Sequence, residues 1–105
     1  MKKILTASLA IFALALMTST YMFADGAADF KAKCSACHGA SGAGDTAMGK
    51  NMKIRDLASA DVQGQSDAAL NDIITKGKGH MPAYDGKLSK DQISDLVKYI
   101  RSLKK

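Results

Sequence analysis

The chain has 105 residues, two cysteines and a formal net charge of +5, and 47% of its residues are hydrophobic. This length allows one domain. The lysines are dispersed and do not interleave with aromatic side chains, so the composition excludes the pattern of a nucleic-acid-binding protein, although docking on an acidic protein face stays open.

Residues 1–24 have the order of a secretory signal peptide. Two lysines give a positive start, residues 4–17 form an apolar run, and the small Ala24 suits the position before a cleavage site. The apolar run is shorter than the about 20 residues that a membrane-spanning helix needs. We therefore predict export to the periplasm and cleavage near Ala24, against the alternative of an uncleaved anchor. Residues 25–105 would then form one domain with no stable membrane insertion.

A domain of this size has a marginal hydrophobic core unless something supplements it. A disulfide is one supplement open to an exported protein. A bridge between Cys34 and Cys37, however, closes so small a loop that it would restrict the unfolded chain little. A large apolar cofactor would contribute more.

The first predicted helix spans residues 27–38, which are mostly good helix formers. Within it, Phe30, Cys34, Cys37 and His38 lie four, three and one positions apart. Residues at these spacings share one face of a helix, so we expect the four side chains to project together.

The middle of the chain contains one readable helix. Residues 39–44 are small and glycine-rich and predict a loop. The apolar residues of 45–65 fit neither the helical nor the strand period, so we predict a loop with one short helix there. Ser66 is a suitable N-cap for a helix over 67–76, and Gly77 supplies the stop.

The last helix is the best marked element of the chain. Ser89 and Gln92 form a capping box at its start. Apolar side chains then recur at helical spacing, namely Ile93, Leu96, Val97, Ile100 and Leu103. No segment reads as a β-strand of usable length, so the predicted fold class is all-α.

Cys34, Cys37 and His38 form a C-x-x-C-H motif, the attachment signature of a c-type haem. Two cysteines on one helical turn can each add to a vinyl group of a porphyrin, and the histidine that follows can bind the iron. Three alternatives stay open. They are a thioredoxin-like dithiol, which lacks its βαβ context here, a zinc site that would also need His80, and a plain disulfide.

A haem at this motif needs a ligand on the other face of its iron, and Met81 is the candidate. A thioether is a soft, neutral ligand that favours ferrous iron. Pro82 restricts Met81 to extended backbone conformations, which helps to aim the sulfur from a loop. The neighbouring His80 is a rival ligand, and a lone methionine can also be a core filler.

The chain resembles a small bacterial class I cytochrome c over nearly all of the mature sequence. Four segments carry the resemblance in the family's order: Gly26-x-x-x-Phe30-x-x-x-Cys34, the C-x-x-C-H motif, Met81-Pro82-Ala83-Tyr84, and Leu96 with Tyr99. The resemblance implies the cytochrome c fold, in which the N- and C-terminal helices cross and loops wrap around one covalently bound haem c.

Two departures from the family pattern affect the haem surroundings. Many relatives have a proline soon after the motif, whose carbonyl accepts the proton on the other ring nitrogen of the histidine, whereas residues 39–41 here are Gly, Ala and Ser. We still expect such a bond to His38. The chain also lacks tryptophan, so Asn51, Lys53 and Arg55 are candidates to contact a haem propionate.

The resemblance implies a soluble periplasmic electron carrier, expected as a monomer, that passes single electrons between redox proteins. The donor would be a quinol-oxidising complex or a dehydrogenase, and the acceptor an oxidase, a reductase or a reaction centre. Lys76, Lys78 and Lys87 are expected near Met81, around an exposed haem edge where they would steer an acidic partner.

Two other functions stay open at this point. With His38 and Met81 both bound, the iron has no free position, so we do not expect an enzyme. A haem-based sensor or peroxidase-like enzyme is the alternative if Met81 is a labile ligand. A haem-free thiol switch at Cys34 and Cys37 is the third hypothesis.

Overall fold

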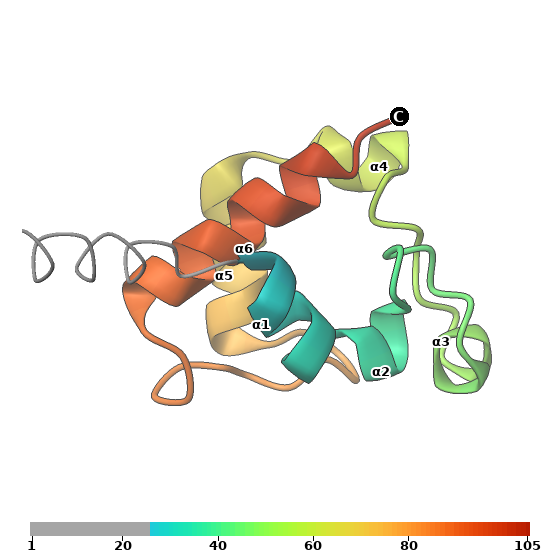
Figure 1. Cartoon of the computed structure of the whole chain (residues 1–105), viewed down its shortest axis with the longest axis horizontal. Coiled ribbons are helices and arrows are strands. Elements are labelled where there is room, and N and C mark those ends of the chain that lie inside the picture. Colours follow the sequence, from blue (N-terminus) through green and yellow to red (C-terminus); the bar gives the residue numbers. More distant parts are fainter. Residues whose placement is uncertain (1–25) are drawn as a thin grey trace, which may run out of the picture.

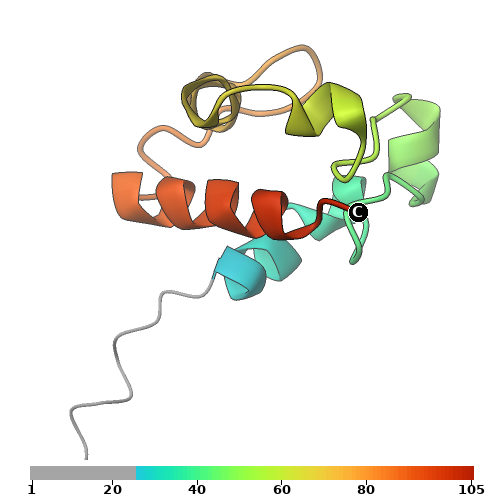
Figure 2. The same ribbon diagram turned by 90° about the horizontal axis from the view of Figure 1, so that it is seen from above.

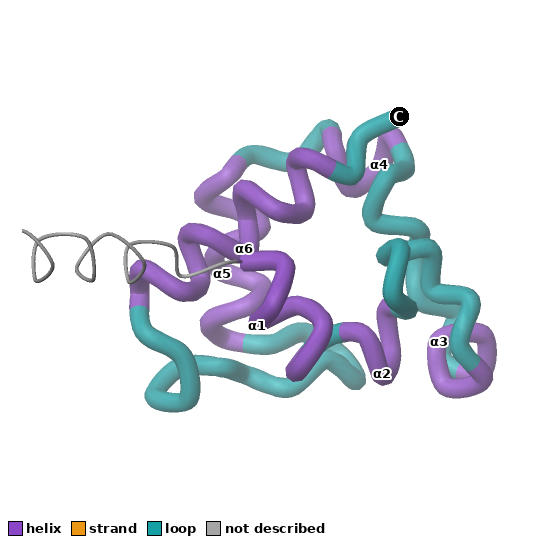
Figure 3. The backbone as a smooth tube through the Cα atoms, in the orientation of Figure 1, coloured by secondary structure: helices purple, strands orange, loops and turns teal. Residues whose placement is uncertain are grey.

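The computed structural model describes residues 26–105, and in this part of the chain it consists of helices and loops without a strand (Figures 1 and 3). The predicted signal peptide and the predicted cleavage site at Ala24 lie outside the described residues. None of the described helices combines the length and the hydropathy of a membrane span. The elements in order are α1 (Gly26–Lys33), α2 (Ser35–His38), α3 (Ala47–Asn51), α4 (Ala60–Gln63), α5 (Asp67–Lys76) and α6 (Lys90–Ser102). The predicted all-α class is confirmed.

The first and last helices are in contact, as predicted, and Figures 1 and 2 both show α1 lying against α6. Phe30 and Leu96 are almost fully buried in this contact. The rings of Phe30 and Tyr99 lie 4.9 Å apart between centroids and are tilted by 42°. Gly26 is buried at the start of α1, where its lack of a side chain allows the backbone of α6 to approach closely.

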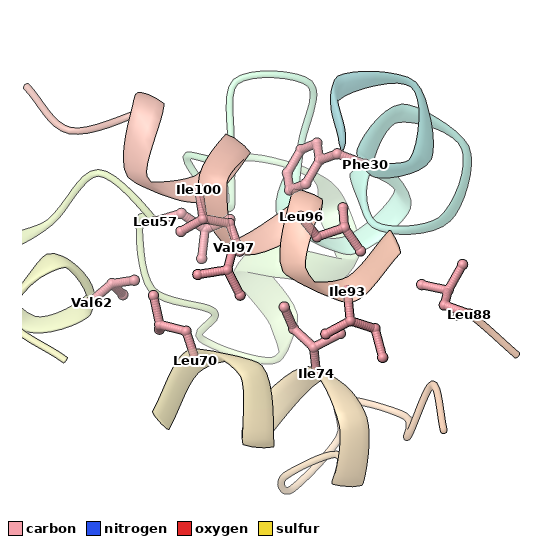
Figure 4. Close-up of a cluster of buried hydrophobic side chains, with 10 residues drawn as sticks. All are labelled: Phe30, Leu57, Val62, Leu70, Ile74, Leu88, Ile93, Leu96, Val97 and Ile100. Atoms are coloured by element: carbon pink, nitrogen blue, oxygen red, sulfur yellow. The ribbon is translucent and has the colours of Figure 1, made fainter. Parts of the chain in front are cut away.

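Helix α5 packs on α6 from the other side. Its N-cap is Ser66, whose hydroxyl accepts a hydrogen bond from the Ala69 amide at 3.1 Å, as the sequence predicts. Leu70 and Ile74 point from α5 toward α6 (Figure 4). The helix ends at Gly77, at the predicted position.

Helix α6 provides the largest share of the core. Its predicted capping box is present, since Ser89 Oγ accepts from the Gln92 amide and Gln92 Oε1 accepts from the Ser89 amide. Ten side chains are buried around it (Figure 4), namely Phe30, Leu57, Val62, Leu70, Ile74, Leu88, Ile93, Leu96, Val97 and Ile100. The core therefore joins α1, α5 and α6 with Val62 of α4 and with Leu57 and Leu88 from the loops.

Arg101, near the end of α6, links this helix to the end of α4, to the start of α5 and to the turn between them. Its guanidinium donates to the Asp67 carboxylate at 2.8 Å, to the Gln63 carbonyl at 2.7 Å and to the Gln65 carbonyl. Gln63 in turn donates to the carbonyls of Leu57 and Ile100, at 2.8 Å each. This network orders a stretch of chain that has little regular structure.

The predicted helix over 27–38 is wrong as a continuous element, because the helix is interrupted at Cys34. The Cys37 amide bonds to the Cys34 carbonyl at 3.2 Å instead of to the Lys33 carbonyl one position earlier. The His38 carbonyl then accepts from the Gly44 amide at 2.7 Å, which turns the chain back after the motif.

The region over 45–65 contains two short helices, α3 and α4, where one was predicted. Thr46 caps α3 by accepting from the Gly49 amide at 2.8 Å, and Ser59 caps α4 by accepting from the Val62 amide. Helices of four or five residues are too short to show an apolar period. Local caps and tertiary contacts decide them instead.

Candidate functional site

The C-x-x-C-H motif occupies the break after α1 and the short helix α2. Thr46 fastens α3 to this segment, since its hydroxyl donates to the Cys37 carbonyl at 2.8 Å. Cys37 Sγ lies 3.4 Å from the sulfur of Met48, a residue that is 49% exposed. Both cysteines are free thiols, so the disulfide alternative is not formed in this structure. Burial, followed by the negative charge of Asp29, raises the pKa of Cys34 to about 11.

His38 is the best placed metal ligand of the motif. Its ring is half-buried, lines two adjoining cavities and lies 6.3 Å from the Phe30 ring between centroids. Burial lowers the pKa of His38, which favours the neutral imidazole that binds metals.

The predicted bond from a carbonyl to the second ring nitrogen of His38 is absent. Nδ1 is buried and has no hydrogen-bond partner among the described residues. Many relatives have a proline soon after the motif, whereas His38 is followed here by Gly39. The loop then bends back on itself, because the Gly44 amide donates to the His38 carbonyl.

Two open cavities lie between the motif and the rest of the domain, with about 1080 and 880 Å³ of empty space when the solvent at their mouths is included. They share five lining residues, namely Cys34, His38, Ile54, Lys78 and Met81. The larger cavity is bounded by core side chains of α5 and α6, such as Leu70, Ile74 and Ile100. The smaller one also contacts Cys37 and the segment from Gly79 to Tyr84. Together they form one mainly apolar crevice.

Met81 lies at the end of a tight turn. The Lys78 amide donates to the Met81 carbonyl at 3.2 Å, and the Met81 amide donates to the Lys78 carbonyl at 3.0 Å. Gly77, at φ 75°, lets this loop pass close to α5, because a Cβ there would come within 2.6 Å of the Met81 carbonyl oxygen. Met81 is half-buried against the core and lines both cavities, whereas His80 is exposed and lines only the smaller one. The geometry therefore brings His38 and Met81 to one crevice.

The loop after Met81 is bound to two helices through Tyr84. The Tyr84 amide donates to the Ile74 carbonyl and the Asp85 amide to the Thr75 carbonyl, both at 3.0 Å, at the end of α5. The Tyr84 hydroxyl donates to the Lys33 carbonyl at 3.0 Å, at the end of α1. Burial, followed by the nearby Cys34 and Cys37 thiols, raises the pKa of Tyr84, so its hydroxyl remains a donor at neutral pH.

The charged side chains around the crevice are basic. Lys33 and Lys78 line the smaller cavity, Arg55 and Lys78 line the larger one, and no Asp or Glu of the described residues lines either. Of the other residues named from the sequence, Lys76 pairs with Asp72 at 3.8 Å on the surface and lines neither cavity. The Lys87 ammonium lies 6.0 Å from the centroid of the Tyr84 ring. Asn51 and Lys53 are exposed and also line neither cavity.

Sequence reasoning missed several walls of the crevice. Ile54, Leu57, Val62 and Gln65 come from the region whose pattern was unreadable, and all four line the larger cavity. Their apolar character was visible, but nothing in their spacing indicated which way they face. The bond from Tyr84 to Lys33 spans 51 positions and has no local signal.

These residues fit a haem. A half-buried imidazole and a thioether share an apolar crevice, and two free thiols lie at its border. The zinc alternative finds no support, since no group of three or more His, Cys, Asp or Glu side chains within residues 26–105 is arranged to hold a metal ion.

Comparison with known proteins points the same way. Residues 22–100 match the family described as "Cytochrome C oxidase, cbb3-type, subunit III". The chain is 39% identical over 71 residues to cytochrome c6 of Leptolyngbya boryana, which covers 68% of this chain and 80% of that protein. It is 35% identical to cytochrome c6 of a Synechococcus species, covering 95% and 91%. Among solved structures, the KustC0563 c-type cytochrome superposes with a TM-score of 0.72 at 30% identity, covering 77% of this chain and 99% of that one.

Proposed function

The chain belongs to the class I cytochrome c family, as a small monohaem member related to cytochrome c6 and to the cbb3-type subunit III cytochrome domain, and from this premise we propose how its residues carry electrons. Its function is electron transfer through one covalently attached haem c, and it is a carrier and not an enzyme. The bound haem supplies a reversible one-electron couple.

We assign the attachment to Cys34 and Cys37, whose thiols would each add across a vinyl group, the sulfur to one carbon and the proton to the other. His38 would be the proximal iron ligand and Met81 the distal one. The observation that carries this assignment is that His38 and Met81, from segments far apart in the sequence, line the same two cavities. The thioether of Met81 would favour the ferrous state and raise the reduction potential.

The surrounding chain would keep water from the iron and select the partner. The core side chains of α5 and α6 form apolar walls. Lys33 and Lys78, at the smaller cavity, would attract a redox protein with an acidic face, with a quinol-oxidising complex or dehydrogenase as donor and an oxidase, reductase or reaction centre as acceptor. We place the mature protein in the periplasm, since the order of residues 1–24 is that of a secretory signal peptide.

A potentiometric titration of the matured protein, combined with exposure of the ferric form to cyanide, tests this function. A carrier with both iron positions filled should titrate as one reversible one-electron couple and take up cyanide slowly. Fast cyanide binding at neutral pH, or turnover of peroxide, would favour a sensor or peroxidase-like enzyme with a labile Met81.

A further inference from the structure

The interruption of the helix at Cys34 leaves one backbone acceptor free. In a continuous helix the Lys33 carbonyl would accept from the Cys37 amide. That amide instead bonds to Cys34, and no backbone amide of the described residues donates to Lys33. The carbonyl lies one residue before the first cysteine of the motif.

The Tyr84 hydroxyl donates a hydrogen bond to the Lys33 carbonyl at 3.0 Å. The backbone of Tyr84 is bonded to the Ile74 carbonyl at the end of α5. Tyr84 also packs against the core and lines the smaller cavity. A single residue thus spans from the wall that carries Met81 to the wall that carries the C-x-x-C-H motif.

We propose that Tyr84 is a positioning residue for Met81, whose hydroxyl bond to the Lys33 carbonyl holds the 78–85 loop against the haem-attachment segment and so keeps the Met81 sulfur on the iron. The proposal rests on the assignment of Met81 as the distal ligand. Without the hydroxyl bond, the backbone bonds of this loop run to α5, at Tyr84 and Asp85, and from Lys87 and Leu88 to the Tyr84 carbonyl, and none of them reaches the C-x-x-C-H motif. The loop can then open away from the motif while its attachment to α5 persists.

The Tyr84→Phe variant tests the proposal, because it keeps the ring and removes only the donor. Tyr99→Phe is the matched control, since it deletes the hydroxyl of another half-buried tyrosine that makes no side-chain hydrogen bond with residues 26–105. Ferric wild-type protein and both variants would be compared by cyanide uptake and by the methionine-to-iron charge-transfer band during urea titration.

We expect Tyr84→Phe to bind cyanide about threefold faster, a factor typical of one partly exposed hydrogen bond. Its charge-transfer band should also disappear at a lower urea concentration than its helical circular dichroism, and Tyr99→Phe should behave as wild type in both assays. Equal cyanide rates for Tyr84→Phe and Tyr99→Phe would overturn the proposal. If the wild type itself lacks the charge-transfer band, the assignment of Met81 fails instead, and the two outcomes are distinct.

A second measurement needs no variant. In the ferrous wild-type protein, a Tyr84 hydroxyl bonded to the Lys33 carbonyl keeps the edge of the tyrosine ring close to this residue, so the ring protons beside the hydroxyl should show a nuclear Overhauser effect to residue 33 or 34. A Tyr84 ring with no such effect would contradict the proposal even if Tyr84→Phe does not mature.

Discussion

A Cβ atom on Gly26 would stand 2.9 Å from the Asp95 carbonyl carbon and 3.2 Å from the Tyr99 Cβ, so α1 and α6 meet with no room for a side chain at this point. The neighbouring Phe30 can reach Leu96 and the Tyr99 ring only because the two backbones approach this closely. The crossing in turn fixes the start of the segment that carries Cys34, Cys37 and His38.

Gly26→Ala should therefore destabilise the protein, although alanine is the better helix former. Helix propensity favours alanine by up to about 1 kcal/mol, while forcing a methyl group into a packed contact costs about 1–3 kcal/mol. Urea unfolding of the two proteins measures the difference. The control is Ala28→Gly on the exposed side of α1, which should cost only the propensity term. An unchanged or raised stability of Gly26→Ala would show that the helices cross elsewhere.

Met81→Ala should abolish the charge-transfer band of the ferric protein, lower its reduction potential and open the iron to cyanide. The reason is the loss of a thioether that favours ferrous iron. Absorption spectroscopy and potentiometry read out the change. His80→Ala is the neighbouring control, because His80 is exposed and lines only the smaller cavity. If His80→Ala changes the iron spectrum and Met81→Ala does not, His80 is the ligand.

Lys78→Glu should slow electron exchange with an anionic small-molecule oxidant by up to about tenfold at low ionic strength, because the side chain lines both cavities. The effect should shrink as salt is added. Lys76→Glu is the control, because it makes the same charge change two positions earlier, at a residue that lines neither cavity. Stopped-flow rates that fall equally in both variants would indicate a general charge effect and no site at the crevice.

Acid should destabilise the haem-free chain through His38. Burial lowers the pKa of His38 below 6.5, so the unfolded state binds the proton more readily than the folded one. The stabilisation from this residue is therefore complete above pH 6.5 and is lost as the pH falls through the lowered folded value. Urea unfolding of the haem-free chain and of its His38→Ala variant, followed by helical circular dichroism above and below pH 6.5, checks the sign. A wild type that gains stability relative to His38→Ala as the pH falls would contradict it.

The parts of the fold that follow from local signals were predictable. Short stretches of sequence predict the Ser66 and Ser89 caps, the helix stop at Gly77 and the apolar stripe of α6. The structure confirms each of them. The break at Cys34 was not predictable in this way, since residues on both sides of it are good helix formers. It depends on the turn after His38, which the Gly44 amide closes.

In the candidate site, too, the residues with a local sequence signal were predictable and the contacts without one were not. The spacing of Cys34, Cys37 and His38 and the setting of Met81 before Pro82 pointed to side chains that do line the crevice. The bond expected between His38 and a carbonyl is absent, because the loop after the motif turns back through the bond from the Gly44 amide to the His38 carbonyl and leaves Nδ1 without a partner among the described residues. The link from Tyr84 to Lys33 depends on a carbonyl that becomes free only when the helix breaks.

The pyridine haemochrome spectrum of protein produced with the c-type maturation machinery tests the central claim most directly. If both Cys34 and Cys37 hold the haem, the spectrum is that of a porphyrin with no free vinyl group. The haem then also remains bound to the protein when acidified acetone is used to extract it. Replacing either cysteine by alanine should shift the spectrum to that of one free vinyl group. Haem that extracts into the solvent, or a matured protein without colour, would contradict the account.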